Sequence, residues 1–173
     1  CLEIRLFGPT LRVKADSVRV ALTGTETAIE LLGQDSRTVA AGQSATLKRG
    51  QEFRVSALRD TATAYLAVAC GFDLPEFPGS KSTYTPGGFG GLDGRPLARG
   101  DTLPLSLASA PAGRDLKVQA AAEPHFQSTV RIVLGPQDDH FSEQGLATFL
   151  SKPYRVSDQM SRMGIRLLGE EVE

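Results

Sequence analysis

Cysteine is scarce in this 173-residue chain, and its scarcity argues against a disulfide-stabilised scaffold. Only Cys1 and Cys70 occur, far apart in the sequence. A chain with so few cysteines is expected in a reducing compartment, and we predict a cytoplasmic location. Cys70 ends an apolar run, where a small buried residue is expected rather than an activated nucleophile.

Neither an excess of charge of one sign nor a long apolar run is present. The 19 Lys and Arg nearly balance the 20 Asp and Glu, which does not favour binding to nucleic acid or to an anionic membrane. No apolar run approaches the ~20 residues that cross a bilayer. The first residues also lack the basic start and apolar core of a signal peptide. We therefore expect no nucleic-acid partner and no membrane partner.

Metal ligands and hydrolase nucleophiles are also scarce. The two histidines, His125 and His140, have no Cys or His at a metal-ligand spacing. Asp138, Asp139 and His140 are adjacent, so on an extended chain they point to opposite sides. No Gly-x-Ser-x-Gly nucleophile elbow occurs. The sequence therefore predicts no metal site.

What the chain does contain is a series of short segments in which apolar and polar residues alternate, as in half-buried β-strands. The predicted strands are residues 2–6, 11–15, 17–22, 28–32, 45–48, 52–57, 116–120, 129–134, 154–156 and 164–168. Residues 49–51 contain Gly50 and are predicted to form a hairpin-like connection. Short strands separated by turn signals favour a mainly β fold, an antiparallel sandwich or barrel.

One convincing helix is predicted, over residues 143–150. Ser142 is suited to the N-cap position, Glu143 to the positive end of the helix dipole, and Lys152-Pro153 to the end of the helix. Residues 106–115 have little pattern and are predicted to be a linker. It would separate a first β-barrel-like subdomain, 1–105, from the start of a second, 116–173.

The segment 64–105 is the most distinctive part of the chain. It opens with an apolar run, 64–70, that is predicted to be a strand buried on both faces. A long loop follows, with six glycines: Gly79, Gly87, Gly88, Gly90, Gly91 and Gly94. Long ordered loops are often functional, and glycine allows positive φ or the close approach of a ligand.

A cluster of hydroxyl groups around one cation lies inside this loop: Ser80, Lys81, Ser82, Thr83 and Tyr84. It is not a P-loop, because Ser80 rather than glycine precedes Lys81 and the following Pro86 and glycines prevent a helix. Lys81 could still pair with a carboxylate or phosphate. The alternative is an elaborate turn held by side-chain-to-backbone hydrogen bonds.

Two further groups of polar residues precede secondary structure near the C-terminus. Gln137, Asp138 and Asp139 lie between a predicted strand and the helix, and Arg162 precedes a predicted strand. Each is either a local cap or ion pair, or part of a cleft that also contains Lys81.

These residues fall into motifs that resemble the biotin-dependent carboxyltransferase family, also called allophanate hydrolase subunit 2. The matching motifs are G-S-K-S-T-Y at 79–84, G-F-G-G at 88–91, G-R-P-L-A-R-G-D at 94–101, V-L-G-P-Q-D-D at 133–139 and S-R-M-G-I-R-L at 161–167. Family members are longer at both ends, with a T-x-Q-D-x-G-R-x-G-(Y/F) opening that is absent here. The resemblance implies two related subdomains of cyclophilin-like β-barrel type, in agreement with the predicted strands. Unpaired sheet edges would favour a partner or self-association.

The function that the resemblance implies first is that of the C subunit of an ATP-dependent amidohydrolase of 5-oxoprolinase type, acting on a cyclic amide with the A and B subunits. The residues assigned to catalysis are Lys81, Arg162 and Asp138. Those assigned to substrate binding are Gly79, Ser80, Ser82, Thr83, Tyr84, Gly88, Gly90, Gly91 and Gln137.

Two alternatives stay open. The first is the carboxyltransferase part of a biotin-dependent urea or amide carboxylase. Biotin would then arrive on another domain, because this chain has no A-M-K-M biotinylation motif. The second is a non-enzymatic, KipA-like antagonist of a kinase inhibitor.

Overall fold

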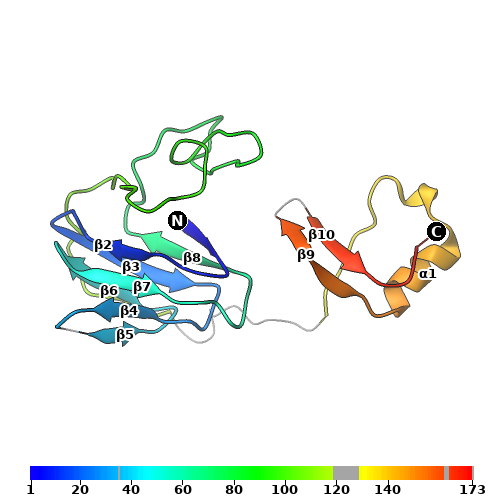
Figure 1. The fold of residues 1–173 in the computed structure, drawn as a ribbon, viewed down its shortest axis with the longest axis horizontal. Coiled ribbons are helices and arrows are strands. Elements are labelled where there is room, and N and C mark those ends of the chain that lie inside the picture. Colours follow the sequence, from blue (N-terminus) through cyan, green and yellow to red (C-terminus); the bar gives the residue numbers. More distant parts are fainter. Residues whose placement is uncertain (35, 119–128, 162–163, 173) are drawn as a thin grey trace. The chain divides into compact units, whose positions relative to one another are not determined.

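The computed structural model describes residues 1–34, 36–118, 129–161 and 164–172. The chain divides into two compact units, 1–125 and 126–173, which are described separately below. Nearly all of the strands belong to the first unit (Figure 1). The mainly β, antiparallel fold predicted from the sequence is confirmed.

The first unit contains two four-stranded antiparallel sheets. Its strands are β1 (Leu2–Arg5), β2 (Thr10–Arg12), β3 (Ser17–Thr23), β4 (Ile29–Leu32), β5 (Arg37–Val39), β6 (Ser44–Lys48), β7 (Glu52–Val55) and β8 (Thr63–Val68). One sheet has the order β1-β8-β3-β6 and the other the order β2-β7-β4-β5. Every strand pair within these sheets is antiparallel.

The core follows from the alternation that the sequence shows. In β3, Val18, Val20 and Leu22 are buried and the residues between them are only half-buried. The same pattern in the other strands supplies further buried residues: Ile4, Ile29, Leu31, Val39, Ala45, Leu47, Phe53, Val55, Ala64 and Leu66. Full burial of one such Val, Leu, Ile or Phe side chain contributes roughly 1.5–3 kcal/mol. The apolar face of each sheet is thereby removed from water.

The predicted hairpin at residues 49–51 is wrong, because β6 and β7 lie in different sheets. β6 pairs with β3, whereas β7 pairs with β2 and β4. The Gly50 N–H donates to the Val13 carbonyl at 2.9 Å, and the Gln51 carbonyl accepts from the Val13 N–H at 3.0 Å. The turn therefore crosses from one sheet to the other beside the β2–β3 connection. Both strands bury residues in the same core, so their alternation is the same as in a hairpin.

The apolar run 64–70 is buried on one face only, contrary to prediction. β8 has strand neighbours on both sides, and Ala64 and Leu66 are buried, but Tyr65 between them is 39% exposed. Cys70 is also exposed rather than buried. It has φ of 62° and lies in the turn that follows β8, where Gly71 has φ of 79°. The side chains of this turn no longer alternate with the strand, which explains why the strand pattern misplaced Cys70.

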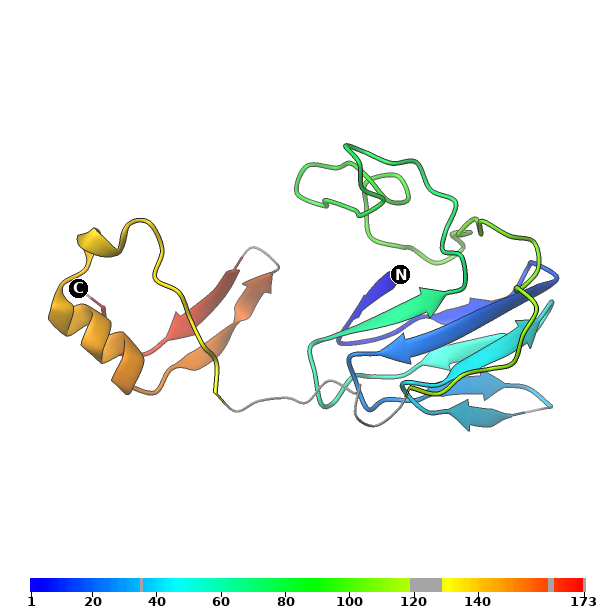
Figure 2. The same ribbon diagram turned by 180° about the vertical axis from the view of Figure 1, so that it is seen from behind.

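The predicted linker, 106–115, is hydrogen-bonded to the first unit. The Asp16 N–H donates to the Ala108 carbonyl at 2.9 Å. Asp115 accepts from the Thr46 hydroxyl at 2.8 Å and from Arg19 Nε at 3.3 Å. Figure 2 shows this segment running along the strands of the first unit. Because of these contacts, the division between the units falls after the predicted linker.

The second unit contains the predicted helix. The helix α1 (Glu143–Ser151) begins after Ser142, whose hydroxyl accepts from the Gly145 N–H at 3.0 Å, and Lys152 ends it. A 3-10 helix, η2 (Asp138–His140), precedes it, and β9 (Arg155–Ser161) and β10 (Gly164–Leu168) follow as an antiparallel pair. The helix prediction and the two C-terminal strand predictions are confirmed. No helix in the described part of the chain combines the length and apolar character needed to span a membrane.

Residues 129–134 do not form the predicted strand. They have no ladder partner among the described residues, and Val133 is 96% exposed. A β-strand is stabilised by cross-strand pairs, so an alternating sequence alone does not form one.

Candidate functional site

The glycine loop, residues 69–105, leaves the end of β8 and returns to the same place (Figure 1). Phe72 and Leu105 form an isolated antiparallel bridge, and the Asp73 N–H donates to the Pro104 carbonyl at 2.9 Å. The Ser106 N–H donates to the Gly71 carbonyl at 3.3 Å. The loop is therefore closed at its base by backbone hydrogen bonds, in the manner of a short β-ladder.

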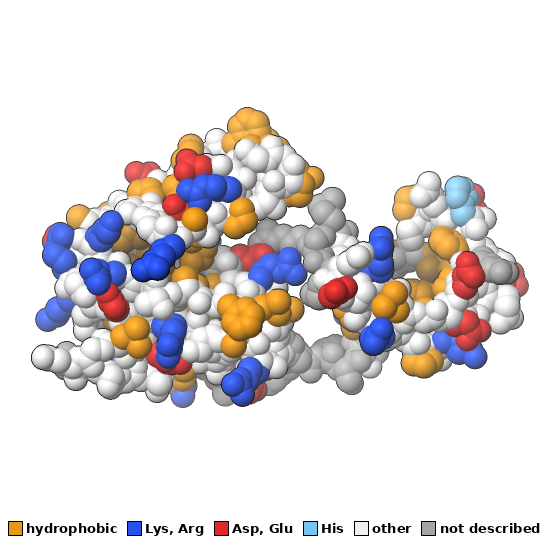
Figure 3. All heavy atoms as spheres, in the orientation of Figure 1, with side chains coloured by type: hydrophobic (Ala, Val, Ile, Leu, Met, Phe, Trp, Pro, Cys, Tyr) orange, Lys and Arg blue, Asp and Glu red, His pale blue; other side chains and the backbone are white. Residues whose placement is uncertain are grey.

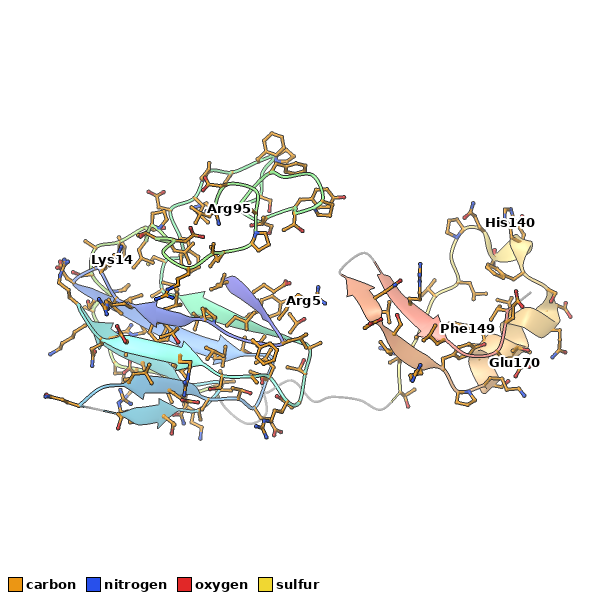
Figure 4. All side chains as sticks on the ribbon, viewed as in Figure 1. Arg5, Lys14, Arg95, His140, Phe149 and Glu170 are labelled. Atoms are coloured by element: carbon orange, nitrogen blue, oxygen red, sulfur yellow. The ribbon has the colours of Figure 1, made fainter. Side chains whose placement is uncertain are left out.

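An ion pair fixes the second half of the loop. The two terminal nitrogens of Arg95 donate to the two carboxylate oxygens of Asp101 at 2.8 and 3.0 Å. The Ala98 N–H donates to the same carboxylate at 2.7 Å. The hydrogen bond from Arg95, followed by the bond from Ala98, lowers the pKa of Asp101 from 3.8 to about 2. The G-R-x-L-x-x-G-D motif thus forms a turn that is closed by the ion pair between Arg95 and Asp101. Figure 4 labels Arg95 in the loop.

The tip of the loop is a tight turn covered by aromatic rings. The Tyr84 N–H donates to the Phe89 carbonyl at 2.9 Å, and the Gly88 N–H donates back to the Tyr84 carbonyl at 3.0 Å. The Phe89 ring lies 5.0 Å from that of Phe77 and 5.2 Å from that of Tyr84, between centroids. Such edge and tilted contacts are favourable between aromatic rings and help to order the turn.

The glycines allow two passes of the loop to lie against each other. Gly90 has φ of 76°, and a Cβ on it would meet the Ser82 carbonyl oxygen. Gly91 has φ of 56°, and a Cβ there would meet the Thr83 hydroxyl. Residues 82–83 and 90–91 are therefore in contact at a separation that only glycine permits.

Lys81 is exposed and its ammonium group donates to the Phe72 carbonyl at 3.2 Å. The Ser82 N–H donates to the Ser80 hydroxyl at 3.1 Å. These two contacts are of the kind expected in a turn that is stabilised by hydrogen bonds between its own side chains and backbone. An ammonium group has three donors, so one bond to a carbonyl leaves Lys81 able to donate to a bound anion as well.

The candidate residues of the glycine loop lie in one unit, and two further candidates lie in the other. Gly79, Ser80, Lys81, Ser82, Thr83, Tyr84, Gly88, Gly90 and Gly91 belong to the first unit. Gln137 and Asp138 belong to the second unit, where their carbonyls accept from His140 and Phe141 N–H at the 3-10 helix η2. Arg162 lies outside the described residues. A common cleft containing all of them stays a prediction.

Sequence reasoning missed a large groove in the first unit. It has a volume of about 1160 Å³ and lies between β2, β3, β8 and the segment 97–108. Leu103, Leu105 and Leu107 alternate along the chain, and Leu107 falls in the segment that was predicted to be a linker. All three line the groove.

No three His, Cys, Asp or Glu residues are grouped as a metal site would require within the described ranges of the chain.

The full chain, residues 1–173, matches the family described as "Carboxyltransferase domain, subdomain A and B". It is 34% identical to the C subunit of 5-oxoprolinase from Escherichia coli (strain K12) over 170 residues, which is 98% of this chain and 52% of that protein. It is 29% identical to urea amidolyase of Saccharomyces cerevisiae over 182 residues, 97% of this chain and 9% of that protein.

A solved structure, that of the K. lactis urea amidolyase, has a TM-score of 0.84 and 28% identity, and the match covers 97% of this chain and 11% of that one. The chain thus spans about half of the first relative and a small part of the others. These matches cover nearly the whole chain and therefore both units. The chain belongs to the carboxyltransferase-domain family, of which it matches subdomains A and B.

Proposed function

We propose that this chain is part of the C subunit of an amidohydrolase of 5-oxoprolinase type, which opens a cyclic amide at the expense of ATP together with the A and B subunits. The observation that carries the proposal is the 34% identity to the C subunit of 5-oxoprolinase over 98% of the chain. The braced glycine loop supports it, because its backbone and Lys81 present hydrogen-bond donors at a surface.

Opening a cyclic amide needs activation, since the amide carbon is a poor electrophile. Phosphorylation of the amide oxygen makes that carbon accessible to attack by water. Negative charge then develops on the substrate oxygens, and preorganised donors stabilise such charge in the transition state. We assign this role to Lys81 and the N–H groups of the glycine loop, with Asp138 and Arg162 as further catalytic candidates.

The glycine loop does not itself fit the triphosphate of ATP. A phosphate-binding loop is followed by a helix whose N-terminal N–H groups meet the phosphates. Residues 79–101 lead instead into turns and a returning strand-like segment. We therefore assign ATP binding to the partner subunits, while this chain contributes to binding of the amide substrate.

Reconstitution tests this function. The full-length polypeptide containing this chain is mixed with the purified A and B subunits, and 5-oxoproline-dependent release of phosphate from ATP is measured. The expected result is activity with all three components and none when this polypeptide is omitted. An assembled three-component complex that never hydrolyses ATP in response to 5-oxoproline would refute the assignment.

The structural comparison favours a second candidate, a carboxyltransferase half-site. The TM-score of 0.84 against a urea amidolyase is the observation that supports it. In this function the loop would hold the ureido oxygen of carboxybiotin that arrives on another domain, and Arg162 would hold the carboxylate that is transferred to the substrate. Transfer of a labelled carboxyl group from carboxybiotin to urea, without 5-oxoproline-dependent ATP hydrolysis, would favour this candidate over the first.

A further inference from the structure

The strand β6 lies at one end of its sheet, and its outer edge is covered by residues 113–118, a segment that we call the strap. In the sheet of order β1-β8-β3-β6, β6 is paired with β3 on one side. On the other side Gln43, just before β6, forms an isolated antiparallel bridge with Lys117 of the strap. The Ser44 N–H donates to the Leu116 carbonyl at 2.8 Å. The strap therefore occupies the place of a further strand beside β6.

The ladder between the strap and β6 is short, and a side chain supplies its next acceptor. The Val118 N–H donates to the Gly42 carbonyl at 2.8 Å. In the same register Arg114 would lie opposite Thr46. The Thr46 N–H donates instead to the Asp115 carboxylate at 3.2 Å. A carboxylate therefore takes the place that a backbone carbonyl has in a regular strand pair.

Asp115 also joins the strap to β3. Its carboxylate accepts from the Thr46 hydroxyl of β6 at 2.8 Å and from Arg19 Nε of β3 at 3.3 Å. A terminal nitrogen of Arg19 donates to the Gly113 carbonyl of the strap at 2.6 Å. The Arg19 side chain is only 16% exposed, so these bonds satisfy a guanidinium that is largely withdrawn from water. Asp115 is thus the residue through which the strap is bonded to two strands of the sheet.

Polar bonds hold the strap in place, because none of its side chains is buried. All of its residues are exposed, and Leu116 and Val118 are 64% and 42% exposed. Exposed apolar side chains also stand among charged ones on the face of the first unit shown in Figure 3, and single ones need no covering partner. A segment with few buried apolar contacts opens locally at a lower free energy than global unfolding requires. The strap can therefore detach while the two sheets stay folded.

A separate set of bonds holds the chain just before the strap. The Asp16 N–H donates to the Ala108 carbonyl at 2.9 Å, and the Ala110 N–H donates to the Ser17 hydroxyl at 2.9 Å. None of these bonds involves Asp115 or β6. The strap thus follows a segment that is anchored independently of it, and this segment provides a fixed end about which the strap can move.

We propose that the strap opens and closes on β6 as one unit, with Asp115 as the latch that holds it closed. The Leu116 N–H is part of this unit, because it donates to the Ser44 hydroxyl at 2.7 Å. Four backbone N–H groups lose their partners together on opening: those of Ser44, Thr46, Leu116 and Val118. The open state leaves the edge of β6 available to another extended chain, so the closed strap is a cover for that edge. The device is separate from the glycine loop and operates whichever reaction the loop supports.

Amide hydrogen exchange of the 173-residue chain, followed by NMR, tests the proposal. In Asp115→Asn the latch loses its charge but keeps its shape. We expect exchange at Ser44, Leu116 and Val118 to become at least about tenfold faster. Exchange at Thr46 should accelerate by a similar factor. Of these four N–H groups only that of Thr46 donates to Asp115 itself, so acceleration at the other three reports opening of the whole strap.

Asp16→Asn is the matched control. Asp16 is also an ion-paired aspartate beside this part of the chain: it contacts Arg49 at 2.7 Å and accepts from the Ser109 hydroxyl at 3.4 Å. Because Ser109 precedes the strap, exchange at the four amides should stay as in the wild type. Acceleration in Asp16→Asn as large as in Asp115→Asn would show that Asp115 is not the latch.

A second variant approaches the unit from β6 and leaves the latch in place. Ser44→Ala removes the acceptor of the Leu116 N–H, and exchange at Thr46 and Val118 should accelerate with it. Two further outcomes would overturn the proposal. One is faster exchange only at the N–H group whose own bond a variant removes. The other is equal acceleration at Leu66 of the inner strand β8, because the opening would then be global unfolding.

Discussion

Arg95 and Asp101 form a two-bond ion pair, at 2.8 and 3.0 Å, that fixes the second half of the glycine loop. Only five residues separate the two, and the turn between them is held by the Ala98 N–H, which donates to the same carboxylate. Because the partners are charged and bidentate, these are among the stronger types of hydrogen bond in proteins. The pair therefore ties together the two ends of the turn formed by residues 95–101.

Removing the charge of Asp101 is expected to loosen the loop. Trypsin cleavage after Lys81 and Arg99 should become about three- to tenfold faster in Asp101→Asn, because local opening exposes these bonds. The matched control is Asp93→Asn. Asp93 contacts Arg95 at 3.5 Å and is 71% exposed, so its loss should change cleavage little. Equal cleavage rates in wild type and Asp101→Asn would show that the pair does not restrain the loop.

The same pair predicts a pH dependence. The pKa of Asp101 is lowered from 3.8 to about 2, mainly by the hydrogen bond from Arg95. A depressed carboxyl pKa contributes stability that is fully present above the unfolded value and is lost as the pH falls through the folded value. We expect a ¹³C NMR titration of the Asp101 carboxyl to have its midpoint near 2 in the wild type. In Arg95→Ala the midpoint of the Asp101 titration should rise towards 3.8. A midpoint near 3.8 in the wild type would contradict the ion pair between Arg95 and Asp101.

The glycines of the loop should differ in what an added Cβ costs. Gly88 has φ of 69° and open space around it. Gly88→Ala should therefore lose stability only through the backbone strain of positive φ, about 1–2 kcal/mol. In Gly90→Ala the new Cβ also meets the Ser82 carbonyl, so the loss of stability should be larger. Gly88→Asn is the control, because Asn tolerates positive φ better than Ala. Thermal unfolding measures all three, and equal losses at Gly88 and Gly90 would show that the two passes of the loop are not in contact.

The N-cap of α1 offers a test in the second unit. The Ser142 hydroxyl accepts from the Gly145 N–H at 3.0 Å, so Ser142→Ala should cost about 0.5–2 kcal/mol of stability. Asn caps helices as well as Ser does, so Ser142→Asn should stay close to the wild type. Urea unfolding followed by circular dichroism measures the difference. An alanine variant as stable as the asparagine variant would contradict the cap.

The sequence predicted local structure well where the cause is local. The alternation of Val18, Val20 and Leu22 identified β3, and Ser142 identified the start of α1. Strand pairing was less predictable, because the segments on either side of Gly50 alternate alike whether they pair in one sheet or cross between two. Whether a strand has one buried face or two depends on which parts of the chain cover it. This explains why Tyr65, predicted to lie in a strand buried on both faces, is exposed.

The candidate site was predicted in composition but not in its contacts. The glycine loop and its polar residues were found from the sequence, and the family was confirmed by the comparisons. The bond from Lys81 to the Phe72 carbonyl joins residues that no sequence motif links. Leu11 and Leu107 line the groove from distant parts of the chain, and a local pattern cannot indicate that two such residues share a groove.

The most direct test of the proposed function is the 5-oxoproline-dependent ATP hydrolysis of the complete complex when Lys81 is replaced. Lys81→Ala should reduce turnover by roughly a hundredfold or more, because an electrostatic contact to the transition state is lost. Its melting temperature should barely change, since Lys81 is exposed and makes one bond at 3.2 Å. Lys48→Ala, at another exposed lysine, should retain wild-type turnover. Normal turnover in Lys81→Ala would contradict the account and leave the glycine loop as an internally braced turn.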